Sequence, residues 1–150
     1  NYFGEYMEFK NGFEFLMAIK DGKIKSPAAM AQTIPMRIID VHPGHIKYAV
    51  TPDERHLNLQ GLIHGGFCAT VLDTATGGAV HTTVENGVSF ATLDLNVKMI
   101  RPLQKDKTYI AIGDVINTGR NILTSEARIV DESDKVYAFG SATLMITNRS

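Results

Sequence analysis

The sequence contains a single cysteine, no long apolar run and no cluster of basic residues. One thiol, Cys68, cannot form an internal disulfide, which excludes a disulfide-stabilised scaffold and predicts a reducing, cytoplasmic location. No apolar run reaches the roughly 18 residues that a membrane-spanning helix needs, so we expect no membrane partner. Fifteen Lys and Arg against sixteen Asp and Glu give a net charge of -1. Because there is no basic stripe, nucleic acid is not an expected partner either.

Signature motifs of several enzyme classes are also missing. There is no G-x-S-x-G elbow of a serine hydrolase, no phosphate-binding loop and no dinucleotide fingerprint. His42 and His45 flank a Pro-Gly turn and lack acidic or cysteine companions at ligand spacing, which predicts a turn and no metal site. Cys68 has no base beside it and is interpreted as a core residue. We therefore expect chemistry without a metal or cofactor.

The residues that are present are typical of one globular domain, with 150 residues of which 44% are hydrophobic and 21% charged. We predict a helical N-terminal extension over residues 1–35 and a compact domain over 36–147. Apolar residues at three- and four-residue spacing predict an amphipathic helix over 5–20, which Asp21 and Gly22 end. A second helical turn is expected before the first strand. The sequence does not decide whether this extension covers a sheet edge or lines a pocket.

The rest of the sequence shows strand and helix patterns in turn. Two β-branched apolar runs at 36–41 and 45–51 predict a hairpin, and a longer run at 66–80 predicts a helix that is apolar almost all round. From residue 88 the hydrophobic period changes to two, as in a sheet with one dry and one wet face. Short turns favour antiparallel neighbours among the strands there. Four strands are expected, over 88–99, 108–118, 122–130 and 135–146.

In the first of these strands, the predicted dry face holds Leu93, Leu95, Val97 and Met99, and Thr92 lies on the wet face. The chain order of helix, hairpin, buried helix and four strands predicts an α+β fold. In this fold one long antiparallel sheet wraps around a central buried helix. The N-terminal helix is an addition to that core.

Asp73 is the one acid in the apolar helix, and a carboxylate there loses solvation that hydrogen bonds or function must offset. At 100° per residue it shares a ridge with Gly66, Thr70 and Gly77, so its neighbours are small. Such a ridge admits another backbone or a slender substrate. We expect a buried, functional carboxylate; the alternative is a position at a solvent-facing edge of the helix.

Gly65 and Gly66 open this helix, where backbone N–H groups are uncovered by side chains and lie at the positive end of the helix dipole. Such donors suit an oxyanion hole, although a glycine pair also serves to turn a loop into a helix. His64 is expected either to orient a substrate or to hold the loop. Asn58 is expected to hold a water or a carbonyl, or else to form an Asx turn. Donors and an acid together indicate acyl transfer.

The spacing between donor and acid bears on the assembly. Asp73 lies eight residues beyond Gly65, which is about 12 Å along a helix at 1.5 Å per residue. One carbonyl cannot touch both, because its oxygen must lie about 3 Å from the donor and its carbon about as close to the attacking group. If both groups act in one reaction, they come from two chains. We therefore predict an obligate dimer with two shared sites and leave a tetramer open.

The pattern N-x-x-G-x-x-H-G-G, followed by an aspartate eight residues after the first glycine of the pair and then by four strands, resembles the PaaI-like branch of the hotdog-fold acyl-CoA thioesterases. The resemblance covers most of the chain. It implies hydrolysis of an acyl-CoA thioester to a free acid and CoA. Asp73 would be the nucleophile or general base, and the Gly65 N–H would polarise the thioester carbonyl. Asn58 and His64 would position water and thioester, and Thr92 would help to hold the lytic water.

The resemblance makes coenzyme A part of the substrate and implies no separate cofactor. Gly66 at the helix start is expected to contact the substrate or CoA. The expected hosts for the CoA phosphates are Arg101 and Arg120, followed by Lys98 and Lys105, although each of these four suits a solvated surface charge equally well. Two other functions stay open, a non-catalytic acyl-CoA sensor or binding module and a hotdog-fold dehydratase or hydratase of 3-hydroxyacyl thioesters. Whether the acyl group is aromatic, medium-chain or long-chain is not determined.

Overall fold

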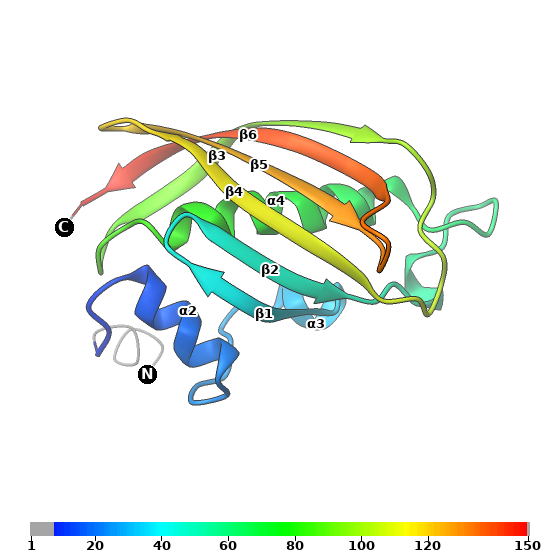
Figure 1. Cartoon of the computed structure of the whole chain (residues 1–150), viewed down its shortest axis with the longest axis horizontal. Coiled ribbons are helices and arrows are strands. Elements are labelled where there is room, and N and C mark those ends of the chain that lie inside the picture. The colour runs from blue at the N-terminus through cyan, green and yellow to red at the C-terminus, as the bar shows by residue number, and fades with distance from the viewer. Residues whose placement is uncertain (1–7, 150) are drawn as a thin grey trace.

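The computed structural model describes residues 8–149 and confirms an α+β arrangement of one sheet and one long helix. Figure 1 shows the sheet curving around α4, with α2 and α3 beside β1. The elements in chain order are α2 (Gly12–Lys20), α3 (Met30–Thr33), β1 (Met36–His42), β2 (His45–Val50), the short 3-10 helix η1 (Glu54–His56), α4 (Gly65–His81), β3 (Ser89–Met99), β4 (Tyr109–Thr118), β5 (Ile122–Val130) and β6 (Val136–Asn148).

All six strands form one antiparallel sheet in the order β1-β2-β4-β5-β6-β3. The expected hairpin of the first two strands is confirmed, and Gly44 in its turn has φ +80°, a conformation that glycine adopts without steric penalty. The consecutive strands β3 and β4 are not neighbours, because segment 100–108 carries the chain from the edge of the sheet to its middle. Among the described strands, β3 pairs with β6 alone and is an edge strand.

The inner face of the sheet buries the apolar side of α4. Val71, Leu72 and Ala75 have no exposed surface, and burial of this kind contributes about 1.5–3 kcal/mol for a large apolar side chain. Gly113 on β4 lets the two backbones approach, because a Cβ at that position would collide with the Ala75 carbonyl oxygen. The expected central buried helix is therefore confirmed.

The opposite side of α4 is not covered by the sheet. Thr70 and Gly77 are half-buried there, and Asp73 is exposed in the single chain. The expectation of a buried Asp73 is therefore wrong for one chain, and the alternative of a solvent-facing position holds. The physical reason is that the sheet wraps around one side of the helix, so the ridge of small residues faces outward.

A β-bulge in β3 changes which side chains face the helix. The pairing of β3 with β6 skips Leu93, which lies between the paired residues Thr92 and Asp94. An extra residue shifts the side-chain alternation by one position. Thr92 therefore faces α4, as does Leu95 farther along the strand, and the prediction that they lie on opposite faces is wrong. Leu93, predicted on the dry face, is 56% exposed.

The N-terminal helix begins later than predicted. α2 starts just after Asn11, whose side chain accepts a hydrogen bond from the Glu14 N–H and so caps the helix. Residues 8–10, inside the predicted helix, are not helical, and residues 5–7 lie outside the described part of the chain. The predicted end at Asp21 is confirmed, and so is a further helical turn, α3, before the first strand.

Candidate active site

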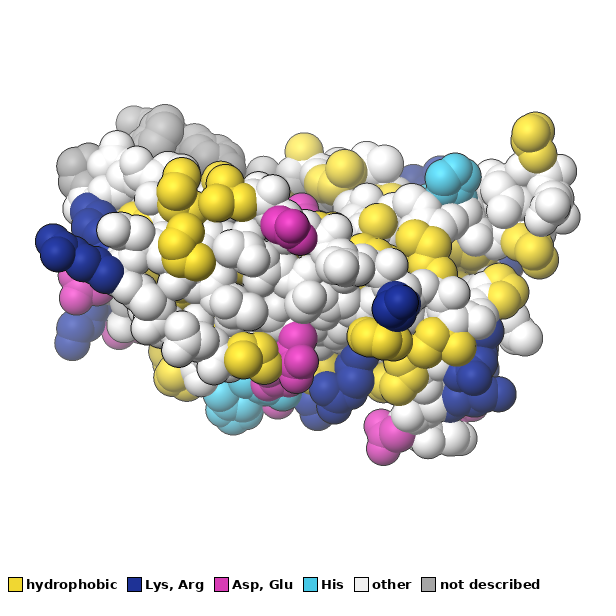
Figure 2. Space-filling view, turned by 90° about the horizontal axis from the view of Figure 1, so that it is seen from above, with side chains coloured by type: hydrophobic (Ala, Val, Ile, Leu, Met, Phe, Trp, Pro, Cys, Tyr) yellow, Lys and Arg dark blue, Asp and Glu magenta, His cyan; other side chains and the backbone are white. Residues whose placement is uncertain are grey.

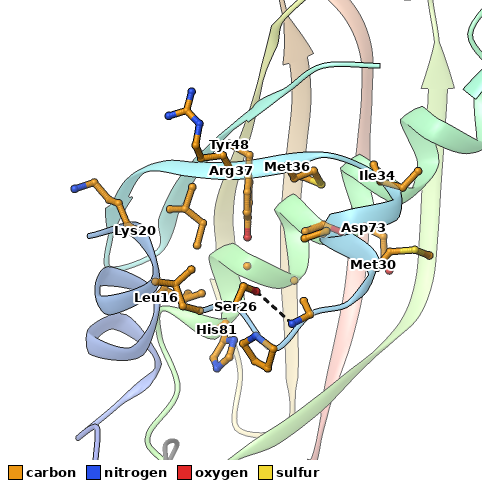
Figure 3. A pocket seen from close by; sticks show the side chains of 18 of the residues that line it. Leu16, Lys20, Ser26, Met30, Ile34, Met36, Arg37, Tyr48, Asp73 and His81 are labelled. Atoms are coloured by element: carbon orange, nitrogen blue, oxygen red, sulfur yellow. Dashed lines mark hydrogen bonds between the residues drawn. The ribbon is translucent and has the colours of Figure 1, made fainter. Parts of the chain in front are cut away.

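A mainly apolar cavity of about 550 Å³ lies between α4 and the N-terminal extension, a size typical of ligand sites. One wall is the outward ridge of α4. The others come from α2, the segment that holds α3, the start of β1 and residues of β2 and β3 (Figure 3). The role that the sequence left open for the extension is thus to line a pocket. The apolar lining includes Phe15, Leu16, Ile19, Ile34, Met36 and Phe90.

Asp73 stands at the rim of this cavity, and Thr92 holds its carboxylate. The Thr92 hydroxyl donates to Asp73 Oδ1 across 2.9 Å, and both residues line the cavity. The second carboxylate oxygen, Oδ2, makes no hydrogen bond to the described residues. An oriented carboxylate with one free oxygen can act as a base or nucleophile towards a group bound beside it. The structure thus brings together two of the predicted site residues.

The N-terminus of α4 offers one of its two glycine N–H groups. His64 caps the helix, and its Nδ1 accepts a hydrogen bond from the Gly66 N–H across 2.7 Å. The Gly66 donor, expected to face the substrate, is therefore occupied, and His64 holds the loop. The Gly65 N–H makes no hydrogen bond to any residue in the described range. Met99 of β3 packs on Gly65, where a Cβ would lie 2.5 Å from its Sδ.

Asn58 shapes the loop that precedes α4. Its Oδ1 accepts hydrogen bonds from the N–H groups of Gln60 and Leu62, across 2.9 and 3.1 Å. This is the Asx turn considered as the structural alternative. Its side-chain NH2 group makes no hydrogen bond to residues 8–149, so this group is available to a bound molecule.

The donor and the acid are far apart within one chain. α4 is continuous from Gly65 to beyond Asp73, so the eight residues between them span about 12 Å. The cavity is lined by Asp73 and Thr92 but not by Gly65, His64 or Asn58. The predicted site residues therefore form two separate groups in the single chain.

The candidate cations near the end of β3 differ in their contacts. Arg101 donates to the Val136 carbonyl, and its guanidinium lies 5.5 Å from the centre of the Tyr137 ring. Lys98 and Lys105 are exposed. Arg101 thus also stabilises the sheet edge, whereas the two lysines are solvated surface charges in this chain.

Arg120 lies at the other end of the sheet. It is in the turn between β4 and β5, where the neighbouring Asn121 bonds to Ile146, the partner of Phe90 near the start of β3. Met99, which packs on Gly65, ends the same strand. Ten residues of strand separate these ends, about 30 Å at 3.3 Å per residue. Arg120 and the helix start are therefore not brought together within one chain.

Two polar residues of the cavity, Tyr48 and His81, were not predicted as site residues. Burial raises the pKa of Tyr48 and lowers the pKa of His81, so both are neutral near pH 7. Tyr48 belongs to a strand pattern that indicates core positions and gives no functional signal. The sequence does contain a signal for His81 as a site residue. His81 lies one helical turn beyond Gly77 and so continues the ridge of small residues that holds Asp73.

Other candidate groups have structural roles. His42 and His45 lie at the expected hairpin turn, where they contact Asp40 and Asp114 at 3.1 and 2.6 Å. Among the described residues, no group of three His, Cys, Asp or Glu side chains is placed to hold a metal ion. Burial raises the pKa of Cys68 to about 11, which keeps this core thiol protonated. No helix in the described range is long and apolar enough to cross a membrane.

Comparisons with known proteins connect this site to one family. Residues 60–138, just over half of the chain, match the family model of the thioesterase superfamily. Acyl-coenzyme A thioesterase 13 of Homo sapiens is 23% identical over 112 residues, which cover 74% of this chain and 79% of that relative.

Solved structures agree on the fold. The phenylacetic acid degradation-related protein of Ralstonia eutropha JMP134 matches with a TM-score of 0.78 and 27% identity, covering 87% of this chain and 98% of that chain. The E. coli PaaI protein matches with a TM-score of 0.79 and 19% identity, covering 92% and 98%. The chain therefore belongs to the thioesterase superfamily and has the hotdog fold of the PaaI-like thioesterases.

Proposed function

We propose that this protein is an acyl-CoA thioesterase, which hydrolyses an acyl-CoA thioester to a free acid and CoA. The observation that carries the proposal is the carboxylate of Asp73, oriented by Thr92 at the rim of an apolar cavity. Membership of the thioesterase superfamily and a relative named acyl-coenzyme A thioesterase support the proposal that the bond hydrolysed is a thioester. An apolar cavity suits the acyl group, and the polar CoA would lie outside it.

The proposed chemistry uses one acid and one donor. Asp73 removes a proton from water while the water oxygen bonds to the carbonyl carbon, or it attacks that carbon itself. Thr92 holds Oδ1, which leaves Oδ2 for this step. The negative charge that develops on the carbonyl oxygen is stabilised by the Gly65 N–H at the positive end of α4. The C–S bond then breaks, and the CoA sulfur takes up the proton that Asp73 removed from the water. Where Asp73 itself attacks, the sulfur takes up a proton from solvent, and a water then hydrolyses the acyl–Asp73 anhydride to the free acid and restores the carboxylate.

In this proposal the acid and the donor come from two copies of the chain. One rigid helix holds them about 12 Å apart, so they cannot meet at one carbonyl. The edge strand β3 contacts both groups, through Thr92 at Asp73 and through Met99 at Gly65. An antiparallel pairing of two β3 edges places the Met99 end of one chain beside the Thr92 end of its partner.

The surface around β3 supports this pairing. Leu93 and Met99 are 56% and 51% exposed, and Ile100 just beyond the strand is 50% exposed. An unpaired edge strand with apolar side chains is a ready template for association. Figure 2 shows the face on which β3 and β6 lie, where several groups of apolar side chains stand between polar ones. A tetramer has no comparable support from this chain.

The same pairing gives the proposed hosts for the CoA phosphates. Lys98 and Arg101 lie near the Gly65 end of β3, and Arg120 lies near its start. Across an antiparallel pair, Arg120 of the partner subunit approaches the Lys98 end of the first chain. The net charge of -1 gives the surface no general attraction for phosphate groups. In this proposal a few cations at fixed positions bind the CoA phosphates instead.

The test is thiol release from a panel of aromatic, medium-chain and long-chain acyl-CoAs. We expect turnover of at least one of them by the wild type and a reduction of about a hundredfold or more in Asp73→Asn, because the base is lost. Asp134→Asn, in the exposed turn before β6, is the matched control and should keep wild-type turnover.

Three other outcomes of this test are informative. Undiminished hydrolysis by Asp73→Asn would remove Asp73 from the mechanism. Binding of acyl-CoA without thiol release would indicate a sensor or binding module. A change in acyl-chain unsaturation with the thioester intact would indicate a hydratase or dehydratase.

A further inference from the structure

The thioether of Met99 lies beside the proposed oxyanion donor. Met99 ends β3, and a Cβ at Gly65 would lie 2.5 Å from its Sδ and 3.0 Å from its Cε. The sulfur therefore packs against the backbone at the start of α4. The Gly65 N–H stands at the positive end of the helix dipole and makes no hydrogen bond to residues 8–149. Because a thioether sulfur is only a weak acceptor, it leaves this donor free for a substrate.

Met99 is open to small solutes. It is 51% exposed in the single chain, and among the described methionines only Met30, at 56%, is similarly exposed. In the proposed dimer the thioester carbonyl has to reach the Gly65 N–H. The space beside Met99 must then admit a substrate much larger than hydrogen peroxide. Exposure is what makes a methionine susceptible to oxidation.

The single thiol does not compete for such an oxidant. Cys68 lies in the core, and burial raises its pKa to about 11. Cysteine reacts with peroxide as the thiolate, which is scarce near pH 7 when the pKa is this high. A methionine sulfur has no proton to lose, so it reacts without this restriction. Exposed methionine is therefore the expected target of mild oxidation in this protein.

We propose that Met99 is a peroxide-sensitive modification site and that its sulfoxide blocks the Gly65 donor. The proposal rests on the proposed function, in which this donor stabilises the negative charge on the carbonyl oxygen. The Met99 sulfur attacks one oxygen of hydrogen peroxide, so that an S–O bond forms and the O–O bond breaks. The proton of the transferred oxygen passes to the leaving oxygen. Methionine is oxidised by two electrons to the sulfoxide, and the peroxide is reduced to water.

The sulfoxide oxygen is a strong acceptor next to an unpaired donor. Its partial negative charge is favoured at the positive end of α4. A hydrogen bond from the Gly65 N–H to this oxygen would occupy the donor, as His64 Nδ1 already occupies the Gly66 N–H. Loss of one oxyanion donor lowers kcat by about a hundredfold to a thousandfold. Oxidation of Met99 should therefore inhibit hydrolysis of every acyl-CoA to a similar degree.

The test is thiol release before and after treatment with hydrogen peroxide, with each protein compared with its own untreated sample. We expect the wild type to lose activity by about a hundredfold, in step with the addition of one oxygen atom to Met99 in peptide mass spectrometry. Treatment with the two methionine sulfoxide reductases, one for each sulfoxide epimer, should restore the activity.

Two variants locate the effect. Met99→Leu removes the sulfur and keeps an apolar side chain, so it should keep most of its activity after peroxide. Met30→Leu is the matched control, because Met30 has a similar exposure but lines the cavity, which Gly65 does not. This control should remain as sensitive as the wild type. An equal loss in Met99→Leu, or activity that survives complete oxidation of Met99, would overturn the inference.

A second measurement does not depend on catalysis. Hydrogen exchange of the Gly65 amide, followed by NMR, should slow in the peroxide-treated wild type, because its N–H gains an acceptor. It should not change in treated Met99→Leu. Unaltered exchange in the oxidised wild type would also overturn the inference, while thiol release by untreated protein upholds the proposed function. Absence of thiol release from any acyl-CoA would overturn the proposed function, and the exchange would still decide whether the sulfoxide binds Gly65.

Discussion

Thr92 donates a hydrogen bond of 2.9 Å to Asp73 Oδ1, joining the first half of the edge strand to the middle of the central helix. The bulge at Leu93 makes this contact possible, because it turns Thr92 towards the helix on the same side as Leu95. The contact fixes the direction of the carboxylate without occupying its second oxygen.

Replacement of Thr92 by valine, which has nearly the same shape, removes the hydroxyl that orients Asp73. A hydrogen bond to a charged group contributes about 1.5–3 kcal/mol, so we expect kcat to fall by about tenfold to a hundredfold. Thr92→Ser keeps the hydroxyl and should keep most of the activity. Steady-state kinetics of thiol release measure both variants. Equal kcat values for the two variants would show that the Thr92 hydroxyl does not contribute to catalysis.

Gly65→Pro removes the proposed oxyanion donor with little disturbance of the helix. Gly65 is the first residue of α4, a position that proline favours, and His64 before it has φ -60° and ψ 137°, which proline accepts in its predecessor. We expect kcat to fall by about a hundredfold to a thousandfold.

Gly65→Ala is the matched control for that variant. It keeps the N–H and introduces the same Cβ beside Met99, whose flexible side-chain end can move away. Thiol release by Gly65→Ala should therefore exceed that of Gly65→Pro by at least tenfold if the donor matters. Similar losses in both variants would point to crowding at Met99.

A mixture of Asp73→Asn and Gly65→Pro subunits should recover activity that neither variant has. In a mixed dimer, one site combines the intact Gly65 of the first chain with the intact Asp73 of the second. The measurement is thiol release after subunit exchange, with exchange verified by two distinguishable affinity tags. If verified exchange brings no recovery, each site is contained within one chain.

Leu93→Lys places a charge on the exposed edge of β3 and should convert the proposed dimer to a monomer with little activity. Ile116→Lys on β4 is the control, because Ile116 has a similar exposure of 57% away from that edge. Sedimentation velocity gives the molecular mass, and thiol release gives the activity. A dimeric Leu93→Lys variant would require another interface.

His81 is expected to make stability depend on pH. Its pKa is lowered in the folded chain by burial, so below about pH 6.5 the unfolded chain binds a proton that the folded chain does not. The free energy of unfolding therefore falls as the pH drops through this value and is unaffected above it. His81→Phe should show a weaker fall between pH 7 and pH 5 in urea unfolding at one protein concentration. Parallel curves for the two proteins would contradict this.

The local sequence determined most of the elements, because hydrophobic period and turn residues act over short distances. The hairpin, the helix of α4, the alternation in β5 and the position of the glycine pair at the helix start all follow from neighbouring residues. So does the spacing of about 12 Å between Gly65 and Asp73, since it depends on helix geometry alone.

The face on which Thr92 lies, the exposure of Asp73 and the cavity were decided by tertiary structure alone. A bulge depends on how two strands pair, so the face on which Thr92 lies cannot be read from alternation in one strand. The exposure of Asp73 depends on which side of α4 the sheet covers. The cavity lies between α2 and α4, and its lining combines Tyr48 and His81 from different elements, a long-range packing result that no local pattern contains.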